Sequence, residues 1–211
     1  MKTRTAILIA FLLLLAGCIR LPSSGSPAPS MYRLQYQPPS QDCDKGPGRV
    51  LRLRDFSASE PYGQQWMVLQ GGNRTVRISA SSKWVAPPGA MLSQALRRDL
   101  ESSGLFGEVI QGSSPGSAPL ELDGKVLVFA AEESDSGYRA LLRARIRLTG
   151  PSFSEAPLLR ETYSLRSDPF PKRDAAGFAR EMSLLAGELS QRIQADLCRM
   201  LDEFETSGQG G

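Results

Sequence analysis

One long apolar stripe near the C-terminal end constrains this fold most. From about residue 174 to residue 204, large apolar side chains recur every three or four positions. They are Phe178, Met182, Leu185, Leu189, Ile193, Leu197, Leu201 and Phe204. This spacing predicts a single long amphipathic helix whose apolar side faces a core rather than a membrane. The remaining chain must supply the layer on which that helix packs.

Period-two patterns before the stripe predict that layer to be a β-sheet. The longest candidate strands are residues 120–130 and 138–149, joined by the acidic segment 132–137. Residues 65–70 and 74–80 flank a Gly-Gly-Asn turn and predict a hairpin. Shorter strands are expected at 32–36, 49–56, 105–110 and 158–165. The strand at 32–36 rests on alternating Tyr32, Leu34 and Tyr36, and Pro38-Pro39 follows it.

A second helix is expected directly after Pro87-Pro88, since proline suits the first turn of a helix. Its apolar face would comprise Met91, Leu92, Ala95, Leu96 and Leu100. Gly104 is placed to end it in a left-handed conformation. Strands interspersed with two helices predict an α/β fold, a single layered domain with a mixed β-sheet and one core.

The N-terminal segment has the pattern of a secretory signal. Lys2 and Arg4 precede an apolar run at 6–15, which is too short to span a bilayer. Leu15-Ala16-Gly17-Cys18 resembles the bacterial lipobox, which implies acylation of Cys18 and removal of residues 1–17. By resemblance to Gram-negative lipoproteins, Ile19 after the cysteine favours the outer membrane, with the body facing the periplasm. The alternative is an ordinary cleaved signal peptide with a chance cysteine.

Composition divides the rest of the chain. Residues 18–30 combine the lipidated cysteine with a stretch rich in serine and proline, which predicts a tether. Residues 31–205 would form the domain, and residues 206–211 a disordered tail. Losing Lys2 and Arg4 with the signal takes two positive charges from a net +3 and leaves +1. Such a balance gives no sign of nucleic-acid binding.

The sequence carries no motif for catalysis. The 211 residues contain no histidine, which excludes Ser-His-Asp and Cys-His nucleophiles and histidine-bearing zinc sites. Gly46-Pro47-Gly48 lacks the Gly-Lys-Ser/Thr ending of a phosphate loop. Asp42-Cys43-Asp44 has no companion ligands for a metal. We therefore expect no catalytic residue, no metal and no cofactor.

Three cysteines are present: Cys18, Cys43 and Cys198. If Cys18 carries lipid, two are left in a compartment where disulfides persist. We predict a Cys43–Cys198 bridge that pins the segment before the first long strand to the C-terminal helix. Two separate buried thiols are the alternative, because spacing alone does not set disulfide geometry.

Two further features have both a functional and a structural interpretation. Arg139, Arg143, Arg145 and Arg147 share one face of the strand at 138–149 and could meet phosphate headgroups or an acidic partner. We favour the simpler interpretation of a solvated face, with Glu121 and Asp123 opposing Arg147 and Arg145, because half-buried strands normally alternate in this way. Trp84 could bind a partner, although the turn chemistry around it favours a core position.

A recognisable set of residues lies between Leu53 and Ile110: Asp55-Phe56-Ser57-Ala58, Tyr62, Met67-Val68-Leu69, the stretch from Lys83 to Leu92, and Ser103-Gly104-Leu105-Phe106. With these residues, Tyr32-x-Leu34 and the closing long helix, about residues 31–205 resemble the ABC-type transport auxiliary lipoprotein family. A resemblance of this kind implies an α/β fold related to the amino-terminal domain of the Tol periplasmic protein. It also implies an outer-membrane lipoprotein that works beside an ABC permease and ATPase and a mammalian-cell-entry (MCE) protein in lipid transport, and it allows homo-oligomers.

These observations together predict a non-catalytic docking subunit of an intermembrane lipid transport system. Within the family motif, a partner surface would involve Trp84, Pro87, Pro88, Met91, Leu92, Gly104 and Phe106. Two alternatives stay open: a lipoprotein that binds one lipid or small hydrophobic molecule, and an envelope scaffold without a transport role.

Overall fold

The computed structural model describes residues 28–40, 43, 48–112, 120–150 and 157–208. The predicted signal peptide, Cys18 and the tether up to residue 27 lie outside these residues. The strands are β1 (Ser30–Tyr32), β2 (Val50–Leu53), β3 (Ser57–Ala58), β4 (Trp66–Gln70), β5 (Val76–Trp84), β6 (Glu108–Gln111), β7 (Leu120–Ser134), β8 (Gly137–Thr149) and β9 (Leu159–Arg166). The helices are α2 (Pro88–Ser103) and α3 (Ala175–Gly208).

Strand β7 organises the sheet because it is long enough to use both of its edges. Along one edge it pairs antiparallel with β8, which in turn pairs antiparallel with β9. Along the other edge, β2, β3 and β4 follow one another, and each pairs parallel with β7. Strand β6 extends the sheet beyond β2, while β5 and β1 extend it beyond β4. The nine strands of the described residues form one mixed sheet, as the sequence predicted.

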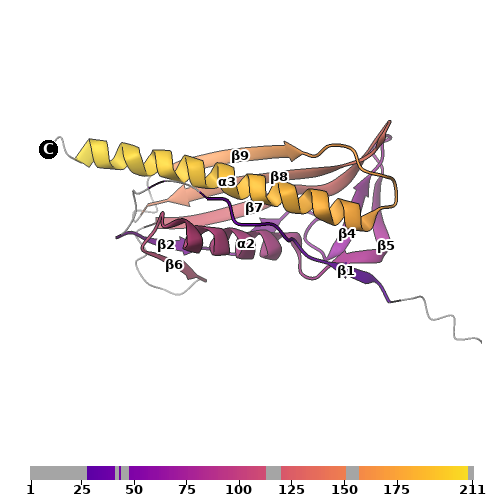
Figure 1. Cartoon of the computed structure of the whole chain (residues 1–211), viewed down its shortest axis with the longest axis horizontal. Helices are drawn as coiled ribbons and strands as arrows, with labels where there is room; N and C mark the ends of the chain where they lie inside the picture. The colour runs from indigo at the N-terminus through magenta and orange to yellow at the C-terminus, as the bar shows by residue number, and fades with distance from the viewer. Residues whose placement is uncertain (1–27, 41–42, 44–47, 113–119, 151–156, 209–211) are drawn as a thin grey trace, which may run out of the picture.

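Both helices cover the same face of this sheet (Figure 1). Helix α3 contacts β8 and β9, and α2 contacts β7, β6 and α3. The apolar stripe is buried from Phe178 through Leu201, and so is the face of β8 that carries Leu142 and Ile146. The opposite face of β8 is open, with Arg143, Arg145 and Arg147 exposed. The fold is therefore a two-layer α/β domain with one core.

Helix α2 begins and ends as its sequence predicts. Pro88 occupies the first turn, where a missing N–H costs nothing. Gly104 adopts φ 72°, a left-handed conformation that a side chain disfavours. The backbone N–H of Leu105 then donates to Ser103 Oγ at 3.2 Å, and Leu105 folds fully into the core.

Several predicted boundaries are wrong. The first strand ends at Tyr32, because β5, its pairing partner, ends at Trp84 opposite it. Strand β7 includes Glu132 and Glu133, which were expected in the turn, because basic partners on neighbouring elements balance their charge. The short strand β3 was not predicted. Helix α3 continues to Gly208 through part of the expected tail, since adding a residue to an existing helix costs little.

Candidate functional site

An extended segment after β1 lies across the helical layer and joins the N-terminal side of the chain to the body. We call residues 33–43 the strap, of which 33–40 and Cys43 are described. It passes between α2 and α3 (Figure 1). The Gln35 backbone N–H donates to Ser183 Oγ on α3 at 3.0 Å, and the Tyr36 hydroxyl donates to Asp99 Oδ2 on α2 at 2.7 Å. The strap therefore contacts both helices.

Asp99 is the polar centre of this contact. Its side chain is completely buried, and besides the Tyr36 hydroxyl it accepts hydrogen bonds from Arg98 Nε at 2.9 Å and Arg98 Nη2 at 2.7 Å. The Arg98 guanidinium lies 4.8 Å from the centre of the Tyr36 ring. Burial, followed by the hydrogen bond to Asp99, raises the pKa of Tyr36 far above its ordinary value. The hydroxyl therefore stays protonated and keeps donating at neutral pH.

Glycine at position 187 lets the strap approach α3 closely. A Cβ on Gly187 would lie 3.0 Å from Cδ2 of Tyr36, tighter than ordinary van der Waals contact. The tyrosine ring thus packs against the backbone of one helix while its hydroxyl reaches the other. This network was missed from the sequence, although Asp99, a lone carboxylate next to the apolar positions Leu96 and Leu100, was a signal for it.

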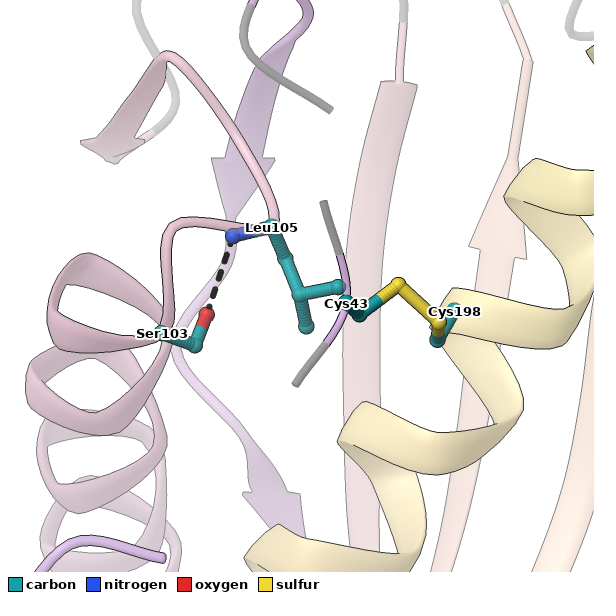
Figure 2. The surroundings of a disulfide bond; sticks show 4 residues. All are labelled: Cys43, Ser103, Leu105 and Cys198. Carbon is teal, nitrogen blue, oxygen red and sulfur yellow. Dashed lines mark hydrogen bonds between the residues drawn. A yellow bond between two sulfur atoms is a disulfide. The ribbon is translucent and has the colours of Figure 1, made fainter. Parts of the chain in front are cut away.

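A disulfide fastens the far end of the strap. Cys43 is bonded to Cys198 on α3, with the two Cα atoms 6.2 Å apart (Figure 2). The side chain of Leu105, just after the end of α2, points toward this bond. The near end of the strap is held by the parallel pairing of β1 with β5. The segment that would connect the body to an anchor is thus fixed by sheet pairing, by hydrogen bonds and by a covalent bond.

The family-motif residues are mostly in the core, which corrects the interpretation that they form a partner surface. Trp84 is fully buried, with its ring edge-on to Phe129 at 5.2 Å and to Phe178 at 5.4 Å between centroids. Buried with it are Pro88, Met91, Leu92 and Phe106, whereas Pro87 is exposed and Gly104 ends the helix. The buried side chains among them belong to the core and are not available to a partner.

The arginines of β8 differ in their burial and in their partners. Arg139 is partly buried, and its Nη1 donates to the Ser167 carbonyl at 3.1 Å. Arg147 Nε donates to Asp123 Oδ2 at 2.8 Å. The expected opposition of Glu121 to Arg147 is wrong, because the register places Asp123 there and Thr149 opposite Glu121.

Glu121 instead forms ion pairs with two arginines of the segment around β2. Its Oε1 accepts a hydrogen bond from Arg54 Nη1 at 3.0 Å, and its Oε2 lies 4.0 Å from Arg52 Nη1. Arg52 lies in β2, which pairs with β7 on the edge away from β8, and Arg54 directly follows that strand. The carboxylate is therefore neutralised across the opposite edge from the one expected.

The described surface has hollows of two kinds. An apolar pocket of about 270 Å³ lies between the β4–β5 hairpin and the start of α3, with Met67, Leu69, Tyr138, Phe170 and Phe178 among its walls. Larger hollows are polar, and one of about 650 Å³ lies over β7, β8 and β9.

The described residues show neither a metal-binding cluster nor a helix suited to a bilayer. No group of three or more cysteine, aspartate or glutamate side chains is placed to hold a metal ion in this part of the chain. Nor does any helix there combine the length and apolar character needed to cross a bilayer.

Solved structures of other proteins have a fold similar to that of this chain. A protein of family DUF330 from Xanthomonas campestris matches with a TM-score of 0.72 and 14% identity, covering 84% of this chain and 99% of that one. An uncharacterised protein matches with a TM-score of 0.53 and 17% identity, over 82% of this chain and 97% of that one. A PelC protein from Paraburkholderia phytofirmans, crystallised as a dodecamer, has a TM-score of 0.47 and 12% identity, covering 73% and 90%.

Sequence comparison assigns the family. No curated protein matched the chain. Residues 32–194 match a family described as the ABC-type transport auxiliary lipoprotein component. This range runs from Tyr32, the last residue of β1, to residue 194 within α3. It includes β2 to β9, α2 and the strap, whereas Cys198, the disulfide partner of Cys43, lies beyond it. By its description, the family groups membrane-anchored envelope lipoproteins associated with ABC transport. The chain therefore belongs to the ABC-type transport auxiliary lipoprotein family.

Proposed function

We propose that this protein is a non-catalytic docking subunit of an MCE-linked system that moves lipid between the two membranes of an envelope. Acylated Cys18 anchors it in the outer membrane, and the body faces the periplasm. There it contacts the MCE protein and the ABC permease and ATPase. The observation that carries the proposal is the strap, which fixes the anchor side of the chain to a rigid two-layer body.

The strap suits a positional role because it limits movement between body and anchor. Sheet pairing at Tyr32, the Tyr36–Asp99 hydrogen bond and the Cys43–Cys198 bridge act on one continuous segment. Movement is then left to the tether before Ser30, whose composition favours a flexible coil. The body therefore stays within reach of the bilayer, while the tether lets it turn toward a partner, which suits a docking subunit.

The apolar pocket favours a second candidate, binding of a small hydrophobic molecule. Its walls come from β4, α3 and the segment around Phe170, and its volume is about 270 Å³. Ligand sites for drug-sized molecules have volumes of about 300–1,000 Å³, so this pocket is small for a cargo. A lipid bound there would co-purify with the protein, whereas the docking proposal expects no stoichiometric lipid. A scaffold without transport partners is the third candidate, and it predicts unchanged lipid balance on deletion.

The anchor is tested by replacing Cys18 with alanine in the full chain. We expect the wild-type protein to incorporate labelled palmitate and to fractionate with the outer membrane. The C18A variant should incorporate no label and leave the membrane, while still forming the Cys43–Cys198 bridge. A cleaved C18A protein that stays in the membrane fraction would contradict the anchor. Recovery of the wild type in the inner membrane would contradict only the outer-membrane assignment.

A further inference from the structure

Four basic side chains gather over one hollow on the open face of the sheet. Lys125 on β7, Arg145 and Arg147 on β8 and Arg160 on β9 line it, together with Thr162 and Asp123. We call these four residues the basic cluster. Two of them, Lys125 and Arg160, were not among the candidates from the sequence, because the pairing of three strands is needed to bring them beside the β8 arginines.

The strand register places like charges directly opposite one another in this cluster. Lys125 pairs with Arg145 across β7 and β8, and Arg147 pairs with Arg160 across β8 and β9. Like charges directly opposite on one face of a sheet are destabilising. Among the residues that line the hollow, Asp123 supplies the one carboxylate, and it bonds Arg147. The cluster thus holds four positive charges against one negative charge.

Basic residues at the other end of β7 and β8 are arranged differently. Arg166 forms an ion pair with Glu132, and Lys172 Nζ lies 2.9 Å from Glu133 Oε1. Glu133 also lies 3.9 Å from Arg77, and the hydrogen bond from Lys172 lowers the pKa of Glu133. The sequence thus provides carboxylates for cations where the hairpin ends. The uncompensated charge is local to the basic cluster, which points to an external anion.

The side chains in the hollow suit a phosphate group. Guanidinium groups present paired N–H donors that match phosphate oxygens, and lysine adds a point charge. The Thr162 hydroxyl adds a neutral donor. Because the four cations line one hollow of about 650 Å³, a compact anionic group can reach several of them at once.

We propose that this hollow binds the phosphate of an anionic lipid headgroup at the membrane surface. The inference rests on the proposed function for the presence of a nearby bilayer. The segment from Cys18 to Ser30 spans at most about 47 Å when extended, which keeps the body near the surface. Basic residues close to an anionic leaflet are attracted to it, and each adds to binding.

Binding is tested on the full lipidated protein in non-ionic detergent, titrated with water-soluble dihexanoyl phosphatidylglycerol by calorimetry. Replacing Arg145 and Arg160 with glutamine should weaken binding about tenfold or more, since two charge-assisted contacts are lost. The matched control replaces Arg180 and Arg192 of α3 with glutamine. These two arginines are also exposed and bear the same charge. We expect less than about a twofold change in that control.

Four outcomes of this titration would overturn the inference. No saturable binding, or an equal loss in both variants, would reduce the cluster to general charge attraction. Inorganic phosphate that binds as tightly as the lipid would assign the hollow to free phosphate. An oligoglutamate peptide that binds more tightly, with the same dependence on Arg145 and Arg160, would assign it to an acidic protein partner.

The melting temperature tests whether the like charges of the basic cluster repel one another in the folded protein. Without ligand, the Arg145→Gln/Arg160→Gln variant should melt at the same temperature as the wild type or higher, because like charges have been removed. A lower melting temperature would contradict the repulsion. Co-purification of transporter subunits gives the separate readout for the proposed function. If lipid binding is intact but no subunit co-purifies, only the docking proposal fails. If the subunits co-purify but the lipid does not bind, only the proposed phosphate site fails.

Discussion

Breaking the disulfide should cost this protein a large part of its stability. Cys43 and Cys198 are 155 positions apart in the sequence, so their bridge closes a very long loop in the unfolded chain. The chain-entropy relation gives about 5 kcal/mol for a loop of that length near 25 °C. Domains of this kind have a total stability of about 5–15 kcal/mol. Replacing both cysteines with alanine should therefore leave the fold marginal.

The assay is urea unfolding of the detergent-solubilised protein, followed by circular dichroism with and without a thiol reductant. We expect the reductant to lower the free energy of unfolding of the wild type by several kcal/mol. The Cys43→Ala/Cys198→Ala variant should start low and show no response to reductant, which makes it the internal control. A loss of less than about 1 kcal/mol in that variant would refute the loop-closure reasoning.

Three further predictions concern the strap and the core. Tyr36→Phe should lower the free energy of unfolding by about 1–3 kcal/mol in chemical denaturation, because buried Asp99 loses a donor; an unchanged value would mean that Arg98 alone satisfies Asp99. Burial raises the pKa of Tyr36 and Tyr163 in the folded state, so their contribution is complete below the unfolded value of 10.0 and is lost as the pH rises above it. The melting temperature should therefore fall above about pH 10, and fall less in Tyr36→Phe; equal slopes would exclude Tyr36 as a cause. Gly124→Ala would place a Cβ 2.7 Å from the Phe56 ring, and we expect a loss of about 1–3 kcal/mol that Phe56→Leu partly relieves.

Elements with a repeated pattern could be predicted from the sequence. The stripe of α3, the alternation of β8 and the Pro88 and Gly104 ends of α2 each depend on neighbours close in the chain. The periodicity therefore records which side is buried whatever the partner is. The mixed α/β class followed from the same patterns, since the one-sided helix needs a layer to pack on and the period-two runs predicted that layer to be a sheet.

Features that depend on distant segments could not be predicted. The alternation of Tyr32, Leu34 and Tyr36 looked like a strand, but the pairing of β1 with β5 ends at Tyr32, opposite Trp84, and Tyr36 bonds to α2 instead. The Tyr36–Asp99 bond joins residues 63 positions apart, and the basic cluster needs the register of three strands. Trp84, in turn, belongs to a motif dense enough to suggest a binding surface, although its packing against Phe129 and Phe178 places it in the core.

We propose that the strap-held body docks onto a transport system, and this docking can be measured in the envelope itself. The most direct measurement is affinity isolation of the tagged full-length protein from chemically cross-linked envelopes, with the bound proteins identified by mass spectrometry. We expect an ABC permease, its ATPase and an MCE protein in wild-type samples, and their loss when Cys18 is replaced with alanine. Recovery of the intact lipoprotein with none of these subunits, under conditions in which they are present in the envelope, would contradict it.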